Sequence, residues 1–177
     1  NDYRDGAIGV DFCVKMCTMI GVDAKVYLWD THHLPNGAPA HSAHHRGWPG
    51  YAIMFDVSKR DSFEEAEMRW FPQVVQHWTL QPGERGAINT LALVGVRQDL
   101  TTGRTRVVTT SEARKLAFKM EQRIQELGAG AALGQRVRYL ETNPETGDGV
   151  DRVVAMLVKP KLKHYLLTQE GGDEWLQ

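Results

Sequence analysis

Alternation of apolar and polar residues marks the first part of the chain. From Ile8 to Met16 every even-numbered residue is apolar, and the odd-numbered residues include an aspartate, a cysteine and a lysine. This period of two predicts a strand over residues 8–17 with one face buried. A turn is predicted at Gly21–Asp23 and a second strand at residues 24–29, so the two strands should form a hairpin.

Later apolar runs have a different pattern. Residues 51–57 and 90–96 are continuously apolar, as in strands buried on both faces of a parallel sheet, and residues 137–142 predict one more strand. Helical spacing separates these runs. The alternation of strands and helices predicts an α/β fold with a mostly parallel sheet.

The predicted helices have recognisable starts and interruptions. Asp61–Glu64 resembles a capping box ahead of a helical stripe that contains Pro72, where we expect a kink or a restart. Thr109–Glu112 should cap a second helix that ends at Gly128. A last helix is predicted from Val150, and Pro160 should stop or bend it.

Composition narrows the class of protein. The 177 residues are 42% hydrophobic and 24% charged, which indicates one globular domain spanning residues 1–177, with a tail at 166–177. A net charge of −1 gives no electrostatic support for binding nucleic acid or an anionic membrane. Cys13 and Cys17 would lie about 13 Å apart on one strand, too far for a disulfide. Two free thiols favour a reducing, cytoplasmic compartment.

A series of short motifs runs in order along almost the whole chain. They are AIGVDF, YLWDT, HHRGW, YAIMFDV, LVGVRQDL and YLET, beginning at residues 7, 27, 44, 51, 93 and 139. In this order and spacing they resemble Rab-type small GTPases of the Ras superfamily. The resemblance implies a G-domain fold, with a mostly parallel sheet flanked by helices.

The glycine-rich phosphate loop of that family, GxxxxGK[ST], does not occur in this sequence. The resemblance implies that the chain starts after the first strand, the phosphate loop and the first helix. We therefore expect an N-terminally incomplete domain, the simplest explanation being an excerpt of a longer chain. A gap or a foreign strand should separate the hairpin from the strand at Tyr51.

Several positions that carry the family's chemistry hold unsuitable residues. Ala7 stands at the magnesium-binding threonine of switch I and offers no oxygen to a cation. His33 replaces a glycine whose amide meets the γ-phosphate, and Leu34 replaces the glutamine that orients the attacking water. Pro144 lies where a backbone N–H should reach the guanine carbonyl, and proline has none. The resemblance thus implies no catalytic residue.

The resemblance also outlines a vestigial nucleotide site, in which Asp99 is the carboxylate that reads guanine. Its implied members are Asp30, Arg97, Asp99, Thr142 and Asn143. For the two aspartates the alternative is structural, as a turn residue and a cap.

The region 31–49, rich in His, Pro and Gly, corresponds to switch II and should be irregular. His41 and His44 have a spacing that would suit zinc, but a solvated or partner-facing loop is favoured and no metal is expected. The family's effector-binding surface maps to Ile8, Phe12, Trp29 and His44. The alternative is that Phe12 and Trp29 are ordinary sheet hydrophobes.

These observations favour a Rab-like pseudo-GTPase that has lost GTP hydrolysis and serves as a protein-interaction module in a trafficking, ciliary or other cytoplasmic assembly. It would bind a protein partner through the hairpin face and need no cofactor. No cysteine for prenylation lies near the C-terminal end, so no lipid anchor is visible. The alternative is a divergent Rab-family GTPase that binds GTP or GDP with magnesium through an upstream phosphate loop and regulates vesicle transport.

Overall fold

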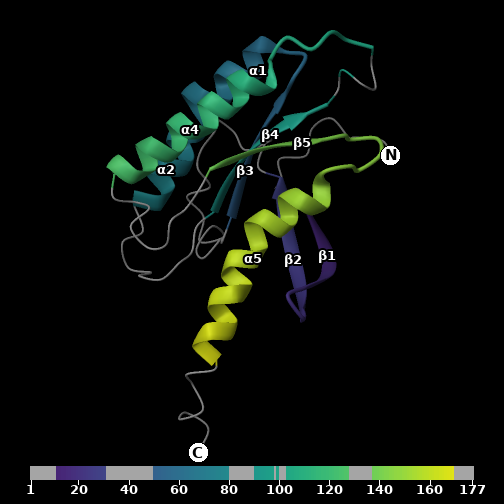
Figure 1. Ribbon diagram of the computed structural model, residues 1–177, viewed down its shortest axis with the longest axis vertical. Helices are drawn as coiled ribbons and strands as arrows, with labels where there is room; N and C mark the ends of the chain where they lie inside the picture. Colours follow the sequence, from purple (N-terminus) through teal and green to yellow (C-terminus); the bar gives the residue numbers. More distant parts are fainter. Residues whose placement is uncertain are drawn as a thin grey trace, which may run out of the picture. The chain divides into compact units, whose positions relative to one another are not determined.

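The computed structural model describes residues 11–30, 50–79, 90–97, 99, 103–127 and 137–169 (Figure 1). These residues belong to two compact units, one within 1–46 and the other within 47–177. Each unit is described by itself.

The first unit contains an antiparallel hairpin of β1 (Asp11–Met19) and β2 (Val22–Asp30). The connecting residues Ile20 and Gly21 both have positive φ, 49° and 77°, as a two-residue type I′ turn requires. The prediction of a turn at Gly21–Asp23 was wrong in its position. Thr18 pairs with Asp23 and Met19 with Val22, so the ladder extends two residue pairs closer to the turn than the apolar pattern indicated.

The two faces of this hairpin are covered to different degrees. On the apolar face, Val14 pairs with Tyr27 and Met16 with Lys25, and the two β1 side chains are 43% and 65% exposed. Val26, on the opposite face, is buried. The predicted burial of the even-numbered face was therefore wrong for Val14 and Met16: among the described residues of this unit, only the two strands themselves are present, and they form no second layer over this face.

The second unit has the predicted α/β architecture. Strands β3 (Gly50–Asp56), β4 (Thr90–Val96) and β5 (Arg138–Thr142) form a parallel sheet in that order. The hairpin strands form a two-stranded sheet of their own.

Helices cover both faces of the parallel sheet (Figure 1). On one face, Phe55 and Leu93 pack with Phe63 of α1 (Arg60–Glu65) and with Leu116 and Met120 of α4 (Thr110–Glu126). On the other face, α5 (Val150–Gln169) packs against β4 in a smaller cluster. That cluster contains Ala92, Val94 and Val153, with Leu140, Met156 and Leu157 against it.

Pro72 restarts its helix, as predicted. A π-helical segment, η3 (Ala66–Trp70), follows α1, and the N–H of Phe71 donates to the carbonyl of Ala66. The helix α2 (Phe71–Thr79) then begins. Pro72 is the second residue of α2, directly after the π-helical segment, and its missing N–H interrupts the hydrogen-bond series at this point.

Of the two predicted capping boxes, one is present. The Thr109 hydroxyl accepts from the N–H of Glu112 at 3.2 Å, and the Glu112 carboxylate accepts from the N–H of Thr109 at 2.9 Å. The box at Asp61–Glu64 was wrong, because α1 begins one residue earlier without a side-chain cap. The hydroxyl of Ser62 instead accepts from the N–H of Asp56 and ties the helix to the end of β3.

The helix ends agree in part with expectation. Helix α4 ends at Glu126, and the predicted terminator, Gly128, lies outside the described residues. Helix α5 continues through Pro160 to Gln169, so of the predicted stop or bend the stop was wrong, and the bend stays a prediction. The ring removes one backbone hydrogen bond but has a helical φ, which lets the chain continue. No helix in the described ranges is long and apolar enough to cross a bilayer.

Candidate functional site

The carboxyl ends of β4 and β5 bring predicted site residues together. Parallel strands end at the same edge of a sheet, which is where α/β folds place their ligands. Arg97 follows β4, Thr142 ends β5, and the N–H of Arg97 donates to the carbonyl of Thr142 at 2.8 Å. Asn143 is the next residue along. Asp99 joins this group through Arg97.

Arg97 and Asp99 form a two-pronged ion pair. Nε of Arg97 donates to Oδ1 of Asp99 at 2.9 Å, and Nη2 donates to Oδ2 at 3.1 Å. Both carboxylate oxygens thus accept from one guanidinium, the strongest geometry for such a pair. The Asp99 side chain is only 11% exposed. The carboxylate that resembles the guanine reader is therefore engaged by a side chain of its own chain.

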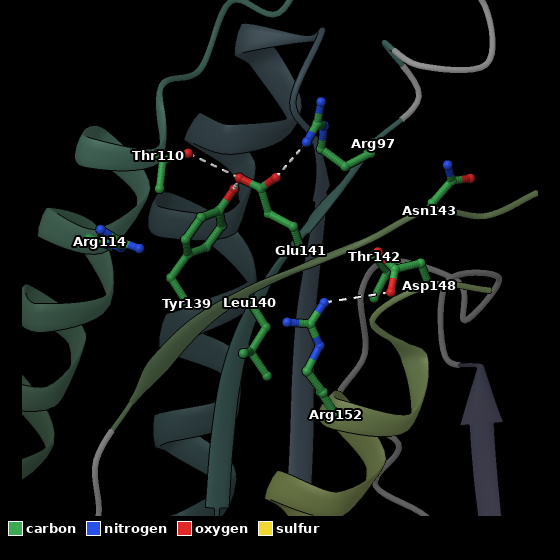
Figure 2. Close-up of a pocket in the computed structure, with 10 residues that line it drawn as sticks. All are labelled: Arg97, Thr110, Arg114, Tyr139, Leu140, Glu141, Thr142, Asn143, Asp148 and Arg152. Atoms are coloured by element: carbon green, nitrogen blue, oxygen red, sulfur yellow. Dashed lines mark hydrogen bonds and ion pairs between the residues drawn. The ribbon is translucent and has the colours of Figure 1, made fainter. Parts of the chain in front are cut away.

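Glu141, at the end of β5, accepts from four donors. Oε2 accepts from Nη1 of Arg97 at 3.0 Å and from Nη2 of Arg106 at 2.8 Å. Oε1 accepts from the hydroxyl of Tyr139 at 2.7 Å and from that of Thr110 at 3.1 Å. Figure 2 shows Arg97, Tyr139 and Thr110 converging on this carboxylate.

These contacts shift the ionisation of the groups involved. Burial pushes the pKa of Glu141 upward, but the donated hydrogen bonds and the arginine charges outweigh it and leave the pKa below its ordinary value. Burial raises the pKa of Tyr139, and its bond to the ionised Glu141 raises it further. The bond to Asp99 contributes most to the raised pKa of Arg97. Glu141 is thus held as a carboxylate at neutral pH.

Sequence analysis did not single out Glu141, Arg106, Tyr139 or Thr110. A signal was present: YLET puts a carboxylate next to the last residue of a predicted strand of the sheet. Such a charge needs a partner. The partner Arg106 lies 35 residues earlier in the chain, a distance that local patterns do not bridge.

The loop after β5 uses Asn143 for its own turn. The side-chain oxygen of Asn143 accepts from the N–H groups of Glu145 at 3.0 Å and Thr146 at 3.3 Å. Its own N–H donates to the carbonyl of Asp148 at 2.8 Å. Pro144 lies inside this turn and, as noted, has no N–H to offer a ligand.

A hollow of about 390 Å³ lies along β5, between α4 and α5 (Figure 2). Its walls are mostly polar. They include Arg97, Glu141 and Asn143 from the network just described, with Arg114 from α4 and Arg152 from α5. Arg152 lies 3.6 Å from the carboxylate of Asp148 in an exposed ion pair.

The other predicted residues lie elsewhere. Asp30 and Trp29 end β2 in the hairpin unit, and Phe12 pairs with Trp29 along the backbone. Trp29 is 37% exposed. Ala7, Ile8, His33, Leu34, His41 and His44 lie outside the described residues. Within the described part of the chain, no three metal-ligating side chains come together.

Comparison with known proteins places these features in a family. The sequence model of the Ras family matches residues 1–162. Among the similar proteins, Ras-related protein Rab-19 of Xenopus laevis is 28% identical over 159 residues, 89% of this chain and 63% of that protein. Ras-related protein SEC4 of Saccharomyces cerevisiae is 28% identical over 94% of this chain and 67% of its own length. GTP-binding protein YPTM2 of Zea mays is 30% identical over 78% of this chain and 64% of its own length. The chain thus spans about two thirds or less of these relatives.

Proposed function

The chain belongs to the Ras family of small GTPases, and we propose that it is a Rab-like pseudo-GTPase that serves as a protein-interaction module. The assembly it serves would be cytoplasmic, on vesicles or on a ciliary or cytoskeletal structure reached through partners. The observation that carries the proposal is the ion pair between Arg97 and Asp99. To read a guanine base along the edge that Arg97 now occupies, Asp99 would have to give up this two-pronged pair.

Other positions support the loss of nucleotide chemistry. The side-chain oxygen of Asn143 accepts hydrogen bonds within its own turn, and Pro144 has no backbone N–H. Ala7 and Leu34 lack the oxygen and the amide that hold magnesium and orient water. We infer that neither GTP nor GDP, nor magnesium, is a cofactor of this chain.

The hairpin supports a role in binding proteins. Its apolar face carries Val14, Met16, Tyr27 and Trp29, all at least 37% exposed. Tyrosine and tryptophan are the residue types enriched at binding hot spots. Without nucleotide exchange there is no γ-phosphate to change this surface, so partner binding would be constitutive.

The second candidate is a divergent GTPase that binds GTP through a phosphate loop upstream and regulates vesicle transport. It is favoured by one relative's name, GTP-binding protein YPTM2. Isothermal titration with magnesium and GTP, of the chain together with any sequence that precedes it, separates the two candidates. We expect no measurable binding heat, with GTP-binding protein YPTM2 as a positive control under the same conditions. A dissociation constant that is micromolar or tighter would contradict the pseudo-GTPase.

A further inference from the structure

The donor pattern that Arg97 presents to Asp99 is also found on a nucleobase. Two N–H groups on one edge of a planar CN₃ unit, from Nε and Nη2, meet the two carboxylate oxygens at 2.9 and 3.1 Å. Guanine contains the same CN₃ unit and presents N1–H and the 2-amino group along one edge. One edge of a carboxylate holds only one such pair of parallel donors at a time, so the two ligands compete for the same edge of Asp99.

We propose that Arg97 is a built-in substitute for the guanine base, occupying Asp99 and thereby excluding guanine from this site. The inference rests on the proposed function, because it explains how a base-reading carboxylate persists in a protein without a nucleotide. Asp99 then fixes the segment after β4 through Arg97 rather than reading a ligand.

A second anchor holds the arginine in place. Nη1 donates to Glu141 at 3.0 Å, so all three nitrogens of the guanidinium contact carboxylates of this chain. A neutral base would bring Asp99 two hydrogen bonds but no charge, and withdrawal of Arg97 would also break its bond to Glu141. Lysine at this position would supply a point charge without the planar edge, so only arginine can occupy Asp99 in this way.

Removing Arg97 should leave the rest of the network intact. Glu141 would still accept from Arg106, Tyr139 and Thr110. The Arg97→Ala variant is therefore expected to fold, with Asp99 left as a carboxylate without its guanidinium. Arg97→Lys is the second variant, because it keeps the charge near Glu141 and cannot reproduce the fork.

The experiment measures thermal unfolding of the full chain with millimolar GMP, IMP or AMP, because a ligand that binds the folded state raises the melting temperature. IMP differs from GMP only by the missing 2-amino group, and all three share the phosphate. We expect no selective shift for the natural chain. For Arg97→Ala, GMP should raise the melting temperature most, IMP by about half as much or less, and AMP least. The double variant Arg97→Ala, Asp99→Ala should lose the preference for GMP.

The outcomes separate this inference from the proposed function. If the natural chain binds no nucleotide and neither Arg97 variant gains a GMP-selective shift, Arg97 is not the base's substitute, although the pseudo-GTPase stands. An equal GMP shift in the natural chain and the variants also overturns the inference. Failure of both variants to fold would assign Arg97 to the fold itself. Tight GTP binding by the natural chain contradicts the proposed function instead.

Discussion

Two regions differ in whether their side chains have partners within the chain: the carboxyl ends of β4 and β5, and the hairpin β1–β2. At the strand ends, each oxygen of Asp99 and Glu141 accepts at least one hydrogen bond from this chain. On the hairpin, Val14 and Met16 keep 43% and 65% of their surface open. A region that binds ligands usually leaves polar groups unsatisfied until the ligand arrives, and a region that binds proteins leaves apolar surface uncovered. The comparison therefore supports the proposal that the protein binds partners through the hairpin rather than a nucleotide at the strand ends.

The largest expected effect on the free energy of unfolding comes from the difference in side-chain packing between the two units. Leu93 is fully buried in the core between the sheet and α4, so Leu93→Ala should lower the free energy of unfolding by about 4 kcal/mol. Met16→Ala on the open face should change it by about 0.5 kcal/mol or less. Urea denaturation followed by tryptophan fluorescence measures both. A large loss from Met16→Ala would mean that this face is covered in the folded protein.

The same contrast explains what sequence predicted well. Residues 90–96 were predicted to the residue, because a continuous apolar run leaves one register. The capping box at Thr109 was predicted because its contacts are local. The hairpin turn was misplaced, since an isoleucine at positive φ contradicts turn propensities. Glu141 was missed because its partner Arg106 is distant in sequence.

The same difference between what local patterns specify and what they do not applies to the candidate site. Arg97, Thr142 and Asn143 were predicted from a resemblance and lie together, because neighbouring parallel strands end at one edge of the sheet. That Arg97 bends back to Asp99 was not predicted. The residue types at positions 97 and 99 make an ion pair possible. Whether the pair forms depends on the course of the chain after β4.

The next prediction tests the hairpin as a binding surface. Trp29→Ala should weaken capture of the protein partner by about 2 kcal/mol, as a large apolar side chain at a hot spot would. Phe118→Ala is the matched control, because Phe118 is an exposed aromatic on α4, in the other unit. Pull-down of a partner by the natural chain and both variants, with circular dichroism to confirm folding, measures the effect. Equal recovery by Trp29→Ala and the natural chain would place the interface elsewhere.

A smaller effect is expected from the charge network. Glu141→Gln keeps acceptors for Tyr139 and Thr110 but removes the charge opposite Arg97 and Arg106. Because the network is partly exposed, we expect a loss of about 1.5 kcal/mol at pH 7, the lower end for hydrogen bonds to charged groups. Thermal unfolding at a fixed ionic strength measures it.

The pH dependence of stability provides the control for the Glu141→Gln variant. The folded protein holds the pKa of Glu141 below its ordinary value of 4.5, so its stabilising contribution is complete above that value. The contribution is lost as the pH falls through the lowered pKa, where the folded state must take up a proton. The difference between the natural chain and Glu141→Gln should therefore shrink below pH 4.5. A difference that grows as the pH falls would show that the carboxylate is not stabilised by its donors.

The smallest effect concerns the turn of the hairpin and has the opposite sign. Ile20 has a φ of 49°, in a region that is unfavourable for β-branched side chains, and its side chain is 47% exposed. Asparagine adopts this conformation readily, and Asn-Gly is the preferred sequence for a type I′ turn. Ile20→Asn should therefore stabilise the hairpin by about 1 kcal/mol. In the natural chain this turn carries strain and an exposed apolar side chain together, which is expected where a surface is kept for a partner.

Amide hydrogen exchange along the β1–β2 ladder should slow about fivefold in Ile20→Asn and accelerate in Gly21→Ala, because the φ of 77° at Gly21 disfavours any side chain. Unchanged exchange in Ile20→Asn would show that the turn is not strained, and the isoleucine would then need no partner to explain it.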